Sequence, residues 1–258
     1  MNFITSRDNP LLKELRRLSQ DSTAYRKLGR VWLEGDHLCR AALDRGVKPE
    51  QAVFAESLWA NAPAAWTQAA TKNTVLPDVL FEDISSLESP AKMGFVLNAP
   101  TSQEVQPQTA TVVLDRVQDA GNVGAILRSA SAFGFKQVLA IKGTAALWSP
   151  KVLRAGMGAH FGLHLVEGLS YEALQALAVP MVATSSHQGP FLHQLLAQGQ
   201  LPMPCAWLMG HEGQGVAPEL SERAALAVRI AQPGGEESLN VATAAAICLH
   251  ASATCALG

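Results

Sequence analysis

Charged residues and cysteines are both scarce in this chain. Only 16% of the 258 residues are charged, and the four cysteines form no C-x-x-C pair and have no metal-ligand spacing. This pattern gives no support to a cysteine-based metal site, and it favours a reduced, cytoplasmic compartment. The hydrophobic content of 48% is ample for a packed core in one or two domains.

Long runs of leucine or isoleucine, which are typical of membrane spans, are also missing. The N-terminus lacks the apolar centre of a signal peptide. Ser238–Leu257 has no charge over 20 residues, but it is rich in alanine and contains Asn240 and His250. We interpret it as a helix buried in protein, and we expect a soluble chain without a membrane partner.

The net charge of −2 hides an asymmetry between the two ends of the chain. Residues 1–48 carry 10 basic and 6 acidic residues, a balance of +4, so the remaining residues carry 10 basic and 16 acidic ones, a balance of −6. A basic front end on an acidic body suggests an anionic partner such as nucleic acid. An ordinary charged helical surface explains the same numbers equally well.

Alternating helix and strand signals predict an α/β protein with two domains. Residues 1–98 form a small α/β domain, 99–111 a proline-containing linker and 112–258 a second domain with more strongly apolar strands. Buried strands that alternate with helices predict a mostly parallel sheet with helices on both faces. The expected strands are 31–33, 52–55, 74–76, 94–97, 111–114, 138–141, 181–184, 206–209 and 227–230, and the expected helices are 10–18, 36–45, 122–133, 171–178, 218–224 and 238–256.

The loops that follow the strands are the place to look for a ligand site, because ligands bind at the carboxyl ends of parallel strands. The first such loop opens the stretch Asp115–Phe135. Asn122 is expected to be the N-cap of its helix. Arg128 lies off the apolar stripe, among the small residues Ala125, Ser129 and Ala132. A lone cation beside small side chains suggests that something approaches it, although an arginine on a solvated helix face is the ordinary interpretation.

Two later loops carry further polar candidates. Gly210–Val216 contains three glycines in six residues, which let the backbone turn tightly or approach a ligand. Glu212 within it is either a helix-entry carboxylate or a catalytic or structural anion. In Ala231–Asn240, a Pro-Gly-Gly turn precedes Ser238, the expected N-cap of the last helix. Asn240 would then lie in the first turn, where its amide could serve a ligand.

Other patterns are weaker. The glycines of Arg154–Gly162 look like a nucleotide-binding loop, but no buried strand precedes them. His160 and His164 have no evident third metal ligand, and G-x-S-x-G is absent.

Taken together, the three loops resemble the three motifs of the SpoU group of SPOUT-class RNA 2′-O-ribose methyltransferases. The matching segments are Asn122–Ala130 (NVGAILRSA), Leu208–Gly215 (LMGHEGQG) and Glu237–Ala245 (ESLNVATAA). Ser6–Pro10 (SRDNP) and Leu33–His37 (LEGDH) resemble the substrate-binding extension of that group. The resemblance therefore covers nearly the whole chain.

This resemblance implies a homodimer that binds S-adenosylmethionine, needs no metal and methylates a ribose 2′-OH of RNA, with 23S ribosomal RNA favoured over transfer RNA. It implies a C-terminal trefoil-knotted domain after an L30e-like RNA-binding domain. By motif match, the cofactor would lie against Leu208, Gly210, Gly215, Ile230, Ser238 and Leu239. The reaction centre would comprise Asn122, Arg128, Glu212, Ser238 and Asn240, and RNA would meet Arg7, Lys13, Arg16, Arg17 and Arg128.

The chain departs from the family pattern at Ala120, His211, Ala231-Gln232 and Glu236. These positions are expected to affect cofactor affinity more than the chemistry. A transfer RNA 2′-O-methyltransferase and a catalytically silent, knotted RNA-binding protein remain alternatives. A nucleotide-dependent α/β enzyme that uses Gly156–Gly162 is a third.

Overall fold

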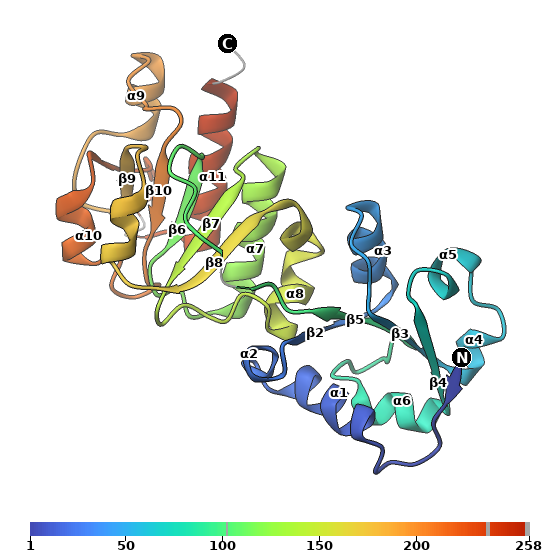
Figure 1. Cartoon of the computed structure of the whole chain (residues 1–258). Helices are drawn as coiled ribbons and strands as arrows, with labels where there is room; N and C mark the ends of the chain where they lie inside the picture. The colour runs from blue at the N-terminus through green and yellow to red at the C-terminus, as the bar shows by residue number, and fades with distance from the viewer. Residues whose placement is uncertain (102, 236–237, 256–258) are drawn as a thin grey trace. The chain divides into compact units, whose positions relative to one another are not determined.

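The computed structural model describes residues 1–101, 103–235 and 238–255, so Glu236, Glu237 and the expected helix end at Ala256 lie outside the described residues. These residues form two compact units (Figure 1). The first comprises Met1–Thr101 and Trp148–Phe161. The second comprises residues 103–147, 162–235 and 238–255. No pattern in the sequence indicates that Trp148–Phe161 belongs with the first unit.

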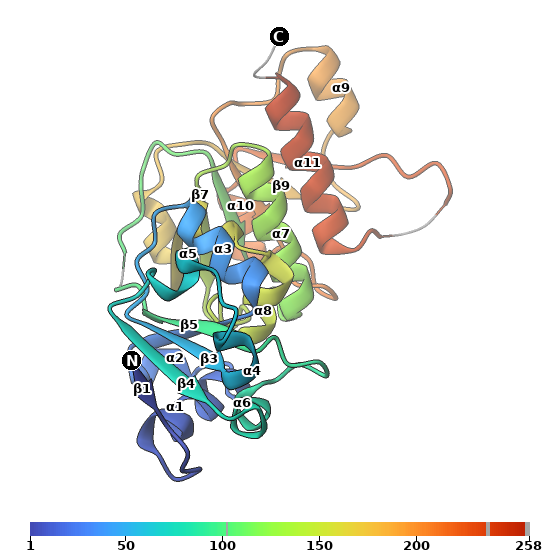
Figure 2. The ribbon, with the colours of Figure 1, turned by 90° about the vertical axis from the view of Figure 1, so that its right-hand side faces the viewer.

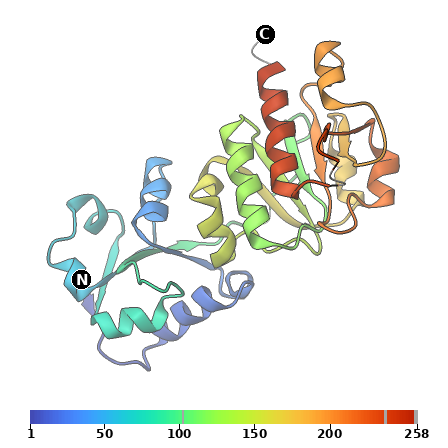
Figure 3. The same cartoon turned by 180° about the vertical axis from the view of Figure 1, so that it is seen from behind.

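The first unit is built on a mixed five-stranded sheet with the order β1-β4-β3-β5-β2. β5 is antiparallel to β2 and β3, whereas β4 is parallel to β1 and β3. Helices α1 and α6 lie side by side on one face, and α3 lies on the other (Figures 1 and 3). The elements are β1 (Asn2–Phe3), α1 (Pro10–Gln20), α2 (Ala24–Leu28), β2 (Arg30–Glu34), α3 (Asp36–Asp44), β3 (Gln51–Ala55), α4 (Glu56–Trp59), α5 (Ala64–Thr67), β4 (Lys72–Leu76), α6 (Asp78–Ile84), β5 (Met93–Asn98), α8 (Pro150–Gly156) and the 3-10 helix η1 (Ala159–Gly162).

The second unit contains a six-stranded sheet with the order β11-β9-β10-β6-β7-β8, in which every pair of neighbours is parallel. The predicted parallel α/β architecture is therefore confirmed. The elements are β6 (Thr111–Leu114), α7 (Ala120–Ala132), β7 (Gln137–Ile141), β8 (His164–Leu169), the 3-10 helix η2 (Glu172–Ala176), β9 (Met181–Thr184), α9 (Leu192–Ala197), β10 (Ala206–Met209), α10 (Pro218–Arg223), β11 (Leu226–Val228) and α11 (Val241–Cys255).

The alternation of side chains along the strands builds a core on each face of this sheet. On one face, Val113 and Leu208 belong to a buried cluster with Leu174 of η2 and Leu220 of α10. On the other face, α7 and α11 lie side by side (Figures 2 and 3). The indole nitrogen of buried Trp207 donates a hydrogen bond of 2.9 Å to Ser252 Oγ and so fastens α11 to β10.

The order of the strands reverses between β6 and β10. The chain continues from β6 to β7 and β8 on one side, whereas β10, β9 and β11 lie on the other side of β6. Helix α7, which follows β6, and helix α10, which follows β10, cover opposite faces. A crevice at the carboxyl ends of two such strands is the usual ligand site of an open parallel sheet. The fold therefore directs attention to Asp115–Asp119 and Gly210–Ala217.

Both predicted N-caps are wrong, although both helices exist. Asp119 caps α7, because its carboxylate accepts the backbone N–H of Asn122 at 2.8 Å, so the helix begins two residues earlier than expected. Asn240 caps α11, because its side-chain oxygen accepts the N–H groups of Ala242 and Thr243. Ser238 precedes that cap and is exposed.

Some predicted elements also need correction. The helix expected at 171–178 is the short 3-10 helix η2, and α8 and α9 had no predicted counterpart. Among the described residues, no helix is both long enough and apolar enough to span a membrane.

Candidate active site

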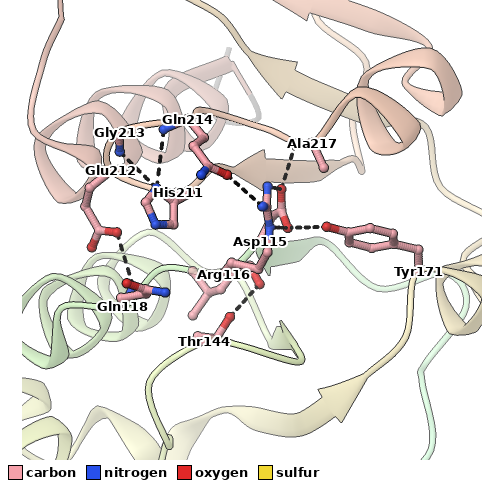
Figure 4. Close-up of polar contacts among 11 residues, drawn as sticks. Asp115, Arg116, Gln118, Thr144, Tyr171, His211, Glu212, Gly213, Gln214 and Ala217 are labelled. Carbon is pink, nitrogen blue, oxygen red and sulfur yellow. Dashed lines mark hydrogen bonds and ion pairs between the residues drawn. The ribbon is translucent and has the colours of Figure 1, made fainter.

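Glu212, in the loop after β10, holds the loop after β6. Its carboxylate accepts the backbone N–H of Gln118 at 3.2 Å and that of Asp119 at 3.1 Å (Figure 4 shows the Gln118 contact). It also accepts from Asn122 Nδ2 at 3.1 Å. Partial burial works to raise the pKa of Glu212, but the hydrogen bonds from Asp119, Asn122 and Gln118 outweigh it and keep the pKa below the ordinary value of 4.5. Glu212 is therefore an anion that acts as a hydrogen-bond acceptor.

Asn240, Asn122 and Glu212 form a hydrogen-bond chain with a fixed direction. A carboxylate can only accept, so Asn122 must present its NH₂ group to Glu212. Its carbonyl oxygen then accepts from Asn240 Nδ2 at 3.0 Å. The carbonyl oxygen of Asn240 in turn accepts the first N–H groups of α11. The structure thus brings together one predicted residue from each of three loops.

Arg128 and Ser238 are not joined to this chain. Arg128 follows Asn122 by six residues on α7, which is about 9 Å along a helix axis. It is exposed and has no hydrogen-bond or ion-pair partner within the described part of the chain, and the small residues Ala125 and Ala132 lie on the same side of the helix. The guanidinium is therefore available to an anionic ligand.

The glycine-rich loop folds tightly back on itself. A Cβ atom on Gly210 would lie 2.1 Å from the carbonyl carbon of Gly215, so only glycine fits there. His211 and Gly215 exchange backbone hydrogen bonds of 3.0 and 2.8 Å, and Gly215 has a φ of +68°. The Nδ1 atom of His211 accepts the N–H groups of Gly213 and Gln214 (Figure 4). His211, one of the departures from the family pattern, thus helps to shape this loop.

Asp115 and Arg116 are polar residues of the site that the sequence reasoning missed. Asp115 is fully buried and accepts hydrogen bonds from the Arg116 guanidinium, the Tyr171 hydroxyl and the Ala217 N–H. The hydrogen bond to Asp115 raises the pKa of Arg116, and burial together with the Asp115 contact raises the pKa of Tyr171. Asp115 could have been identified as a site candidate because it directly follows a buried strand, but no local pattern links it to Tyr171.

The predicted cofactor residues lie in β10 and in the loops that follow β10 and β11. Leu208 and Gly210 are buried, whereas Gly215, Ser238 and Leu239 are exposed. Nothing lies within 4 Å of the Cβ position at Gly234 or Gly235. Open glycine backbone and an exposed apolar side chain such as that of Leu239 suit a ligand with polar edges and apolar parts.

Ile230, another predicted cofactor residue, borders a separate apolar cavity of about 700 Å³ between α9 and α11. This cavity is not lined by Asn122, Glu212 or Asn240, so it does not coincide with the polar chain. Its lining residues are Leu192, His193, Leu196, Ile230, Ala231, Thr243, Ala246, Ile247, His250, Ala251 and Thr254.

Gly156 and Gly158 of the segment Arg154–Gly162 serve packing in the first unit. A Cβ atom on Gly156 would lie 2.6 Å from the His160 ring, and one on Gly158 would lie 2.3 Å from Ala41 Cβ. The segment follows α8 and no strand, so it lacks the context of a nucleotide-binding loop. His160 and His164 lie in different units. Within the described ranges, no group of three or more His, Cys, Asp or Glu side chains could hold a metal ion.

The basic residues predicted to bind RNA are partly paired with acids of the first unit. Asp83 lies 2.9 Å from Arg7 Nε and 3.5 Å from Arg16 Nη2. Lys13 Nζ lies 3.1 Å from Asp8. Arg17 is exposed. Exposed ion pairs of this kind contribute little to stability, so they can exchange for phosphate contacts.

The fold is shared with solved RNA methyltransferases. An RNA 2′-O ribose methyltransferase superposes with a TM-score of 0.80 at 28% identity, over 99% of this chain and all of the other. An AdoMet-bound rRNA methyltransferase from Sinorhizobium meliloti superposes with a TM-score of 0.81 at 28% identity, over 97% of each chain. The second unit thus has the fold of this class of enzyme.

The family itself is shown by sequence. The model of the SpoU rRNA Methylase family matches residues 109–250, more than half of the chain. A Bacillus subtilis 23S rRNA (guanosine(2553)-2′-O)-methyltransferase is 30% identical over 254 residues, 97% of this chain and 98% of its own length. An uncharacterized tRNA/rRNA methyltransferase of Synechocystis is 32% identical over 96% of this chain and 92% of its own length. The chain belongs to the SpoU rRNA Methylase family, and the resemblance drawn from its motifs is confirmed.

Proposed function

We propose that this protein transfers a methyl group from S-adenosylmethionine to a ribose 2′-OH of ribosomal RNA, with 23S ribosomal RNA favoured. The observation that carries the proposal is the directed chain from Asn240 through Asn122 to Glu212, at the point where the strand order reverses. The Bacillus subtilis relative, similar over nearly its whole length, supports the choice of RNA and of the ribose position.

The residues of the second unit suit this cofactor. Gly215, Gly234 and Gly235 offer open glycine backbone, and Leu239 and half-buried Ile230 offer apolar surface. When bound, S-adenosylmethionine supplies an electrophilic methyl group. The protein's task is then to position a hydroxyl in line with that methyl group, which can supply a large part of the rate enhancement of such a displacement.

We assign Arg128 the task of fixing the RNA. A guanidinium keeps its proton in proteins, so Arg128 does not act as a base. It has free donors and no partner within the described residues, which suits a phosphate and the neighbouring 2′-OH. Asn122 and Asn240 hold the three loops around that position, and Ser238 lies two residues before Asn240 with its hydroxyl exposed.

We assign residues 1–98 to RNA binding, with 99–111 as a linker to the methyltransferase domain 112–258. The basic side chains on and before α1 support this assignment. A cytoplasmic location is supported by the four free cysteines. The trefoil knot and the L30e-like character of the first domain stay predictions.

We also propose a homodimer formed through α11. Ile247 on this helix is 38% exposed and borders the apolar cavity beside α9. A second copy of the chain would cover this surface. Sedimentation of the purified protein should give twice the monomer mass of 27.4 kDa, and a monomer at micromolar concentration would contradict the assignment.

The function is tested by incubating the protein with methyl-labelled S-adenosylmethionine and total RNA, followed by mapping of the labelled ribose. We expect one mark in 23S ribosomal RNA from the wild type and almost none from Arg128→Ala. A mark in transfer RNA would favour the transfer RNA alternative. Tight RNA binding without any label would favour the catalytically silent protein.

A further inference from the structure

The C-terminal end of the glycine-rich loop Gly210–Ala217 is held by Asp115, a residue that is not among the predicted site residues. Asp115, at the end of β6, accepts the backbone N–H of Ala217 at 2.7 Å. Its carboxylate is fully buried, and the Tyr171 hydroxyl donates to it at 3.0 Å. A buried carboxylate needs such partners, because an unpaired buried charge is strongly destabilising. The loop end at Ala217 is thus held in one place.

Arg116 extends this anchor to the middle of the loop. Its Nε and Nη2 atoms contact the two oxygens of Asp115 at 2.9 and 3.1 Å. Its remaining terminal nitrogen, Nη1, donates to Gln214 Oε1 at 3.0 Å (Figure 4). One guanidinium therefore bridges a buried anion and an exposed side chain of the loop, which the fork geometry of arginine allows.

The backbone at Arg116 is arranged to permit this bridge. Arg116 has a φ of +58°, a left-handed conformation that is unfavourable for a residue with a side chain. Gly143 leaves room beside it, since a Cβ atom there would lie only 3.2 Å from Arg116 Cγ. Strained conformations of this kind persist where the surrounding structure needs them, often at functional sites.

We propose that Arg116 is a positioning residue for the cofactor. With Asp115 behind it, Arg116 holds Gln214 and so sets the conformation of Gly210–Ala217. This inference rests on the proposed function, in which that loop binds S-adenosylmethionine. The same loop carries Glu212, two residues before Gln214, so the bridge also helps to keep Glu212 in reach of Gln118, Asp119 and Asn122.

The test is a set of variants of the full-length protein titrated with S-adenosylmethionine, with kcat and KM measured on the mapped RNA. Gln214→Ala removes an exposed side chain and should leave the thermal unfolding temperature unchanged. It should weaken cofactor binding about 10-fold, because a loop that is no longer held in place must be ordered when the cofactor binds. The matched control is Gln188→Ala, an exposed glutamine of the same unit, which should bind as the wild type does.

The variant Arg116→Lys tests whether the forked guanidinium is needed to join Asp115 to Gln214. A lysine can neutralise Asp115 but cannot also reach Gln214 with fixed geometry. We expect the same rise in Kd and in KM for S-adenosylmethionine, with RNA affinity unchanged. In the double variant Arg116→Lys, Gln214→Ala the two effects should not multiply, because both remove the same bridge.

The outcomes separate this inference from the proposed function. Wild-type protein that binds S-adenosylmethionine, with unchanged affinity in folded Gln214→Ala, would overturn the positioning role alone. Multiplicative effects in the double variant would overturn it as well. Wild-type protein that binds no S-adenosylmethionine would overturn the proposed function and this inference together. If Arg116→Lys does not fold, the comparison of Gln214→Ala with Gln188→Ala decides.

Discussion

The polar side chains of the two units make different kinds of contact. In the first unit, cations form ion pairs with acids, as Arg7 and Arg16 do with Asp83. In the second unit, polar side chains from three distant loops meet, and Asn122, Glu212 and Asn240 use one another as partners. Ion pairs of this kind can exchange for phosphate contacts, so they leave a surface adaptable to an irregular anion. A directed chain fixes geometry, as a reaction that depends on alignment requires.

The largest effect on activity is expected when Asn122 loses the NH₂ group that it donates to Glu212. Asn122→Asp replaces a donor with an anion that faces Glu212, so one hydrogen bond is lost and a like-charge contact is created. Methyl transfer, measured as kcat/KM, should fall by about 100-fold or more. Asn122→Ala, which adds no charge, should be less harmful. Equal activity in the two variants would show that the direction of the chain is irrelevant.

The next effect concerns Arg128, an exposed cation of the second unit. Arg128→Lys keeps the charge but loses the planar fork, so kcat should fall by about 10- to 100-fold. The thermal unfolding temperature should not change, because Arg128 has no partner within the described residues. Nearly full activity with unchanged RNA binding would rule out a geometric role for Arg128.

A smaller effect is expected in the first unit. Replacing Lys13, Arg16 and Arg17 together with alanine should weaken RNA binding and reduce the slope of log K against log salt by up to about 0.9 for each lost phosphate contact. The control is Asp83→Asn, which frees Arg7 and Arg16 and should strengthen binding slightly. If the triple variant kept the wild-type slope, α1 would not be part of the RNA-binding surface.

The smallest effect concerns acid pH. Because the pKa of Glu212 is held below 4.5 in the folded protein, its contribution to stability is present above that pH and is lost as the pH falls through the folded pKa. Wild type and Glu212→Gln should therefore differ in unfolding free energy near neutral pH and converge below pH 4.5. Since Glu212 is largely exposed, the difference should stay below about 1 kcal/mol. A gap that widens in acid would contradict the assigned contacts.

Much of the fold could be predicted from the sequence, because strands such as Met181–Thr184 and Ala206–Met209 are short apolar runs with clear ends. The helix ends were harder. Asp119 and Asn122 are both good caps by type, and only the backbone path shows that Asp119 accepts the N–H of Asn122. Likewise, α8 lacks a long apolar stripe, and its place in the first unit depends on contacts with α1 and β2.

The candidate site was predictable where motifs carried it and not elsewhere. Asn122, Glu212 and Asn240 were singled out by their place in the loops that follow strands, and the family resemblance then gave them roles. The structure shows how they meet. Arg116 was missed because Gln214, its hydrogen-bond partner in the glycine-rich loop, is 98 residues away in the sequence. A contact over that distance leaves no local pattern. The charge count covered residues 1–48 only, so it gave no indication that Asp83 offsets part of their positive charge.

The central claim is that these residues direct methylation to a ribose hydroxyl. It is tested most directly with two RNA fragments that contain the mapped site and differ only by a 2′-deoxy substitution at that nucleotide. With methyl-labelled S-adenosylmethionine, the ribose fragment should take up about one methyl group per molecule and the deoxy fragment none. Equal labelling of both fragments would place the methyl group elsewhere on the RNA and contradict the assignment.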